Sequence, residues 1–137
     1  MTDGFPTDDM ELTNILVVSD LERSVAFYRD ILGATLAREY GGSSAVFSFQ
    51  SAWLLLVTGG GSTADKPGVV FTTIEDSDRV SHAMTIRVPD CLAAYETLRA
   101  RGATFLTPPV ESEWEVRGFF RDPDGHLLEI SESRAAT

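Results

Sequence analysis

Apolar residues follow a strand pattern over 14–18 and then a helix pattern from Leu21 onwards. Leu21, Val25, Tyr28 and Leu32 are spaced by four, three and four residues, which places them on one face of a helix. Ser19 and Glu22 have the spacing of a capping box at the start of this helix, and Gly33 can end it. The pattern predicts a strand followed by an amphipathic helix.

The same order of elements occurs twice along the chain. NILVVSDLERSVAFYRDILGATL spans 14–36 and MTIRVPDCLAAYETLRARGATFL spans 84–106. Each segment holds an apolar strand, an aspartate after Ser or Pro, a helix, and then Gly-Ala-Thr. In the second segment Asp90 is the expected cap and Gly102 the expected end. The residues expected on its buried face are Leu92, Tyr95 and Leu98.

Three strand-like runs follow each helix. They are expected at 35–40, 44–50 and 53–58, and again at 104–107, 115–121 and 126–131. We therefore predict an α+β fold of two tandem βαβββ modules that form a curved sheet with a central cleft. The expected organisation is an N-terminal tail (1–11), a first module (12–58), a linker (59–81), a second module (82–132) and a C-terminal tail (133–137). The linker piece VVFTTI is expected to be an edge strand or to line the cleft.

Charge and cysteine content limit the partners. The net charge of −10, from 21 acidic and 11 basic residues, argues against nucleic acid and anionic membranes as partners. The charge either serves solubility or indicates a cationic or amine-bearing small-molecule ligand. No apolar run is long enough for a transmembrane helix, and the acidic N-terminus does not resemble a signal peptide, so a cytoplasmic location is expected. Cys91 is the only cysteine, which excludes an intrachain disulfide, and we expect it to be a small packing residue.

Two segments resemble the signatures of a known family. VVSDLERSVAFYRDILG and FFRDPDGHLLEIS are similar to sequences of the vicinal oxygen chelate superfamily, which includes glyoxalase I, extradiol dioxygenases, and fosfomycin and bleomycin resistance proteins. The resemblance covers 14–132 and implies paired βαβββ modules assembled as a homodimer. It also implies, for the enzymes, one divalent metal bound by His or Glu from the first and last strands of each module.

The metal positions implied by the resemblance are Thr13, Leu55, Ala83 and Glu129. Only Glu129 is a good ligand for a divalent cation, so we predict that no metal is bound and no cofactor is needed. If the strand register differs by one residue, His82 could join Glu129, and a divalent metal near these two residues is the alternative. His126, which follows the turn DPDG, is expected to be a solvated turn residue.

Glu129 needs another partner if no metal is present. Alternation over 114–121 puts Glu115, Arg117, Phe119 and Arg121 on one face of a strand, and Trp114, Val116, Gly118 and Phe120 on the other. An arginine of the first face could form a structural ion pair with Glu129. Alternatively, Glu129 accepts a hydrogen bond from a ligand or acts catalytically as a general base.

Aromatic residues on the expected strands are core residues or line a groove for a planar, cationic ligand. The residues expected to bind the ligand are Trp53, Phe71, Trp114, Arg117, Phe119 and Glu129. We predict a metal-independent small-molecule binding protein of the resistance or sequestration type, resembling the bleomycin-binding members. A metal-dependent lyase, isomerase or dioxygenase-like enzyme with a degenerate site is the alternative, and an interaction module without a ligand is a third possibility. Whether the protein is an enzyme stays open.

Overall fold

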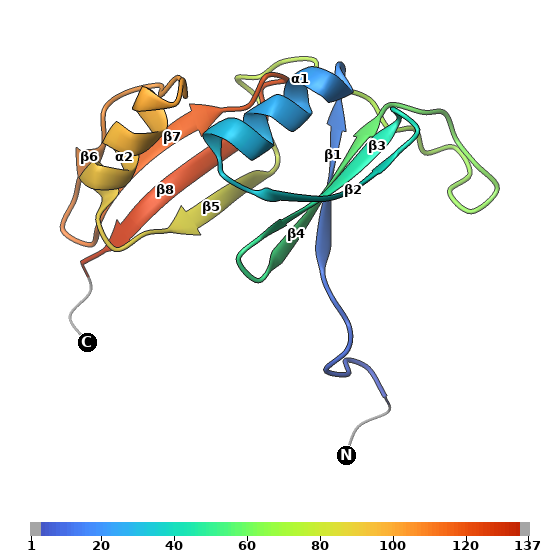
Figure 1. Cartoon of the computed structure of the whole chain (residues 1–137), viewed down its shortest axis with the longest axis horizontal. Coiled ribbons are helices and arrows are strands. Elements are labelled where there is room, and N and C mark those ends of the chain that lie inside the picture. The colour runs from blue at the N-terminus through green and yellow to red at the C-terminus, as the bar shows by residue number, and fades with distance from the viewer. Residues whose placement is uncertain (1–3, 135–137) are drawn as a thin grey trace.

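The computed structural model describes residues 4–134 and contains two four-stranded sheets (Figure 1). The elements are β1 (Thr13–Val18), α1 (Leu21–Ala26), the π-helical turn η1 (Phe27–Ile31), β2 (Thr35–Tyr40), β3 (Ser44–Phe49), β4 (Ala52–Thr58), β5 (Ala83–Arg87), α2 (Cys91–Ala100), β6 (Val110–Glu111), β7 (Glu115–Arg121) and β8 (Leu127–Ser133). The strand orders are β1-β4-β3-β2 and β5-β8-β7-β6, with β1 parallel to β4 and β5 parallel to β8. This confirms the predicted tandem βαβββ modules. The outer parts of both expected tails, 1–3 and 135–137, lie outside the described residues.

The first helix begins at Asp20, whose side chain accepts a hydrogen bond of 3.1 Å from the backbone N–H of Arg23. The predicted capping box of Ser19 and Glu22 is therefore wrong. Ser19 instead donates its backbone N–H to the carboxylate of Asp124 at 2.9 Å, in the turn before β8. This contact between the modules holds Ser19 in place, and Asp20, the next short polar residue, caps the helix.

The helix then widens into the π-helical turn η1, in which the N–H of Leu32 bonds the carbonyl of Phe27, five residues earlier, at 3.1 Å. The predicted apolar stripe from Leu21 to Leu32 is buried, and Phe27 is buried beside Tyr28. The ring centroid of Phe27 lies 6.4 Å from that of Phe120, and the centroid of Tyr28 lies 6.1 Å from that of Phe47. The same helical segment thus packs against both sheets and joins them into one core.

The second helix, α2, is capped by Asp90 as predicted, through a 3.1 Å hydrogen bond from the N–H of Ala93. Its buried face consists of Cys91, Tyr95 and Leu98, whereas Leu92 is 60% exposed. The expected burial of Leu92 is wrong because the buried stripe starts one residue earlier, at Cys91. The prediction that Cys91 is a packing residue is confirmed. Burial is the main cause that raises the pKa of its thiol, followed by the nearby charge of Glu132.

The run at 104–107 does not form the expected strand. Phe105 makes only an isolated bridge to Phe120, and the edge strand β6 comes later, at Val110–Glu111. Two prolines, Pro108 and Pro109, separate the bridge from β6, and proline cannot donate to a ladder of backbone hydrogen bonds. The linker piece VVFTTI also makes only one bridge, between Phe71 and Gly60. No helix of the described residues is long and apolar enough to cross a membrane.

Candidate functional site

Each sheet has one face packed on the helices and an opposite face, which we call the open face. On β8, Leu128 and Ile130 are buried in the core, and alternation turns Glu129 to the open face. On β7 the alternation predicted from sequence holds, because Val116 and Phe120 are buried while Arg117 is exposed. The expected group of Glu129, Arg117 and Phe119 therefore lies on one surface.

Strand register places the side chains of the second open face in rows. Residues paired across β5, β8 and β7 give three rows: Arg87, Ser131 and Arg117; Thr85, Glu129 and Phe119; Ala83, Leu127 and Arg121. Neighbouring strands lie about 4.8 Å apart, so side chains within a row are in reach of one another. Glu129 is central in this arrangement, with a side chain that is only 15% exposed.

The guanidinium of Arg117 lies near two carboxylates on this surface. Nη1 of Arg117 lies 3.9 Å from Glu129 and 3.5 Å from Glu115, and the guanidinium stands 5.4 Å from the ring centroid of Phe119. Glu115 also accepts a 2.7 Å hydrogen bond from the hydroxyl of Ser131. The ion pair considered for Glu129 is thus formed with Arg117, but it is long and its arginine is 51% exposed. Glu129 keeps most of its capacity to accept hydrogen bonds.

Arg121 takes no part in this group. Its guanidinium donates to the carbonyl of Ser77 at 2.6 Å and pairs with Asp78 at 2.9 Å, which anchors the linker to the second sheet. Within residues 4–134, the side chain of Arg87 makes no hydrogen bond or ion pair, so it is a free cation on the open face. The face therefore offers one unpaired guanidinium near a weakly paired carboxylate.

The four positions implied by the family resemblance do not supply a metal site. Thr13 is paired with Trp53 and Ile15 with Leu55 in one sheet, as Ala83 is paired with Leu127 and Thr85 with Glu129 in the other. The two sheets thus place these positions equivalently. Alanine and leucine have no donor atom, so the residues present do not fit a divalent cation. Among the described residues, no three His, Cys, Asp or Glu side chains are grouped to hold a metal ion.

His82 precedes β5. It lines both a cavity of about 250 Å³, with Leu54, Met84 and Leu128, and the hollow beside β1, with Thr13 and His126. Glu129 lines neither of these hollows, so the structure does not bring His82 and Glu129 into one of them.

The other aromatic residues expected to bind a ligand are dispersed. Trp53 is half-buried on the open face of the first sheet, across from Thr13. Phe71 lies in the linker, with the ammonium of Lys66 at 4.9 Å from its ring centroid. Trp114 is 67% exposed in the turn before β7, where strand alternation no longer applies. Only Arg117, Phe119 and Glu129 of the expected set come together in one chain.

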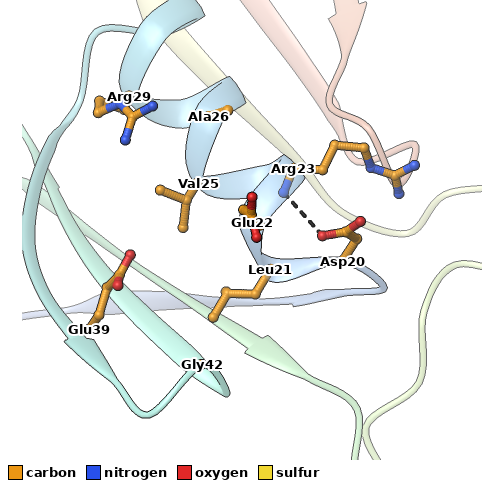
Figure 2. A pocket seen from close by; sticks show the side chains of 9 residues that line it. All are labelled: Asp20, Leu21, Glu22, Arg23, Val25, Ala26, Arg29, Glu39 and Gly42. Carbon is orange, nitrogen blue, oxygen red and sulfur yellow. Dashed lines mark hydrogen bonds between the residues drawn. The ribbon is translucent and has the colours of Figure 1, made fainter.

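A larger hollow lies elsewhere, between α1 and the β2–β3 hairpin, with a volume of about 870 Å³. Figure 2 shows its lining, in which Leu21 and Val25 are flanked by charged side chains such as Glu22, Arg29 and Glu39. None of the residues expected from the sequence to bind a ligand or a metal lines it. Its charged side chains are solvent-exposed, and Arg29 is already paired with Asp30 at 2.8 Å. Size alone therefore does not make this hollow the site.

His126 has a role that the sequence did not reveal. Its Nε2 lies 2.9 Å from the carbonyl oxygen of Val17 on β1, and the side chain is half-buried. The prediction of a solvated turn residue is wrong because the turn before β8 packs against the first module. The partner atom is a backbone carbonyl 109 residues away, which leaves no signal in the local sequence.

The same turn contains a buried carboxylate, Asp122. Its Oδ2 accepts a 2.7 Å hydrogen bond from the hydroxyl of Tyr28, and its Oδ1 accepts the backbone N–H groups of Asp124 and His126. Burial raises the pKa of Asp122. Burial, followed by the charge of Asp122, raises the pKa of the Tyr28 phenol well above its ordinary value. These contacts hold the two modules together rather than forming part of the open face.

A family model described as the Glyoxalase/Bleomycin resistance protein/Dioxygenase superfamily matches residues 11–130. The chain belongs to this superfamily. Lactoylglutathione lyase of Haemophilus influenzae is 31% identical over 136 residues, which cover 90% of this chain and 93% of the relative. The glyoxalase superfamily thus accounts for the fold and for nearly the whole length of the chain.

Two solved structures share this glyoxalase-superfamily fold. TnmS3, an antibiotic binding protein from Streptomyces sp. CB03234, has a TM-score of 0.65 and 20% identity, covering 90% of this chain and 95% of that one. A mutant of the fosfomycin resistance protein FosX from Listeria monocytogenes, solved with Mn(II) and dihydroxypropylphosphonic acid, has a TM-score of 0.66 and 18% identity. The shared alignment covers 90% of this chain and 89% of the FosX chain. These identities establish the fold alone.

Proposed function

We propose that this protein binds a small organic ligand on its open faces without a divalent metal. The observation that carries the proposal is the donor set: of Thr13, Leu55, Ala83 and Glu129, only Glu129 offers a strong ligand atom for such a cation. The fold is shared with TnmS3, an antibiotic binding protein, which agrees with a sequestration role. The cytoplasmic location stays a prediction.

Glu129 would accept a hydrogen bond from a donor group of the ligand, such as a hydroxyl or an ammonium. Phe119, its neighbour in the row, offers an aromatic surface to an apolar part of the same molecule. Trp53 would contribute from the open face of the first sheet. A general-base role for Glu129 stays a prediction that needs a substrate to test it.

A second copy of the chain would complete the site. In one chain, Thr13 lines the hollow beside β1 and Ala83 lines the small cavity near His82, while Leu55 and Glu129 line neither. We propose a two-fold homodimer in which the first open face of one copy covers the second open face of the other. Light scattering at micromolar concentration should give twice the chain mass; a monomer mass would contradict this arrangement.

A metal-dependent enzyme is the second candidate, favoured by the similarity to a lactoylglutathione lyase and by the Mn(II) in the FosX structure. Metal analysis of protein purified without a chelator separates the two. Less than stoichiometric Mn, Fe, Ni and Zn supports the binding protein. One equivalent of metal that is lost in Glu129→Gln supports the enzyme.

Calorimetry with a panel of planar, cationic compounds, with and without EDTA, tests the binding role. We expect saturable binding that EDTA does not change. Glu129→Gln should weaken binding about tenfold, because a hydrogen bond to a charged group contributes about 1.5–3 kcal/mol. Glu113→Gln, an exposed neighbour in the turn before β7, is the matched control and should leave the affinity unchanged.

A further inference from the structure

A second hollow lies between β1 and the linker segment 71–82 and is complete within one chain. Its volume is about 740 Å³. We call it the linker groove. Its floor is formed by the open-face side chains of β1, chiefly Ile15 and Val17, and its apolar walls by Phe71, Ile74 and Val80. Ile15 is 48% exposed although the linker passes over it, so the groove leaves apolar surface uncovered.

The linker is anchored at both ends, which makes the groove preformed. At one end, the backbone groups of Phe71 and Gly60 exchange two hydrogen bonds of 2.8 and 3.1 Å. At the other end, Arg121 holds the carbonyl of Ser77. Gly125 lies so close to Ser77 that an added Cβ would be 2.8 Å from the Cβ of Ser77. A fixed hollow with an apolar floor is the usual form of a small-molecule site.

The carboxylates and the guanidinium of the groove belong to Glu75, Asp76 and Arg79. Glu75 makes no ion pair or hydrogen bond with its side chain within residues 4–134, and Asp76 has only a loose pair with the exposed Arg79 at 3.7 Å. The carbonyl of Val17 can only accept, so Nε2 of His126 donates to it. The carboxylates of Glu75 and Asp76 outnumber the single guanidinium of Arg79, so these groups give the groove a net negative charge.

We propose that the linker groove binds an aromatic or alicyclic amine, with the apolar body on Ile15, Val17 and Phe71 and the ammonium near Glu75. A protonated amine matches the excess of carboxylates in the lining, and the apolar body covers the exposed floor. A carboxylate on the same body would meet Glu75 and Asp76 and be repelled. The groove does not include Glu129, but its floor is part of the first open face, so this inference rests on the ligand-binding role proposed above for that face. Glu75 lies outside the group around Glu129, so substitutions at the two positions distinguish a failure of one proposal from a failure of the other.

Three compounds with the same body but different charge test the proposal: phenethylamine, phenethyl alcohol and hydrocinnamate. Affinities and contact sites are measured by amide chemical-shift mapping in NMR titrations. We expect the order amine, alcohol, carboxylate, with shifts confined to 13–17, 71–82 and His126. Glu75→Gln should lower the affinity for the amine about fivefold and leave that for the alcohol unchanged.

Two controls separate the groove from the other surfaces. Glu22→Gln, in the hollow beside α1, should leave amine binding intact. Val80→Trp, which fills the groove, should abolish binding of both amine and alcohol. The proposal is overturned if the amine does not bind up to its solubility limit or the carboxylate binds as well as the amine. Shifts outside the groove, or a Glu75→Gln effect that is equal for all three compounds, would overturn it as well.

Discussion

The hydroxyl of Tyr28 donates a 2.7 Å hydrogen bond to the buried carboxylate of Asp122 and so joins the helical segment of the first module to the turn that precedes β8. Both residues are buried, and Asp122 also holds the N–H groups of its own turn. The modules therefore share a polar contact as well as an apolar core. Single substitutions at this contact therefore test how much it contributes to the free energy of unfolding.

Tyr28→Phe removes the donor and leaves a buried carboxylate oxygen without its partner. We expect a loss of about 1–3 kcal/mol in the free energy of unfolding, measured by urea denaturation at a fixed protein concentration. Tyr40→Phe is the control, because the Tyr40 hydroxyl is exposed and only accepts from Arg38; its effect should stay within about 0.5 kcal/mol. Equal losses for the two variants would contradict a stabilising role for the Tyr28–Asp122 contact.

The stability conferred by Tyr28 should fall at alkaline pH. The folded protein raises the pKa of this phenol above its ordinary value of 10.0, so the folded state holds the proton more tightly than the unfolded state. The stabilisation is complete below the unfolded pKa and is lost as the pH rises beyond it. The difference in unfolding free energy between wild type and Tyr28→Phe should narrow above pH 10.0. A difference that stays constant in a urea series across this range would be evidence against the raised pKa.

Gly125→Ala tests the close approach of the linker to the second sheet. Gly125 has a φ of +93°, and a Cβ there would lie 2.8 Å from the Cβ of Ser77. The left-handed backbone alone costs about 1–2 kcal/mol for an L-residue, and the contact adds to it. We expect a loss of at least this size in thermal or urea unfolding. Gly61→Ala, where the Cβ meets open space, should change stability by less than about 0.5 kcal/mol.

Restoring the missing donors should create a metal site if the proposed dimer brings the four positions together. The variant Thr13→His, Leu55→Glu, Ala83→His keeps Glu129 and should retain about one Zn²⁺ or Ni²⁺ per chain after dialysis, as four protein ligands suffice for zinc. Adding Glu129→Gln should weaken the binding at least tenfold. If the triple variant binds no metal while remaining folded, the four positions do not meet, and the proposed pairing of open faces is wrong.

The fold could be predicted from the sequence because its signals are local and repeated. The helix cap at Asp90 and the faces of β7 follow from residue type and spacing. Two of the errors are shifts by one residue. Asp20 rather than Ser19 caps α1, because Ser19 is bonded to Asp124 across the chain. Leu92 is exposed because the buried stripe starts at Cys91.

Less of the candidate site could be predicted. Alternation brought Arg117, Phe119 and Glu129 to one face, which needs only the strand period. It could not place Trp114, which lies beyond the strand, or His126, whose partner is a backbone atom of the other module. The linker groove depends on where a segment without regular structure is anchored. Such anchors are set by tertiary contacts and not by sequence patterns.

The π-helical turn at Phe27–Ile31 sets the length of the chain between α1 and β2. It contains one more residue than an α-helix of the same rise would hold. Excising one exposed residue of this turn would let it close as an α-helical turn. Because the wider turn takes up the extra residue within its own span, Leu32 would stay in the core, and Gly33, with its φ of +84°, would still start the turn into β2. In this segment the fold has room for the loss of one exposed residue.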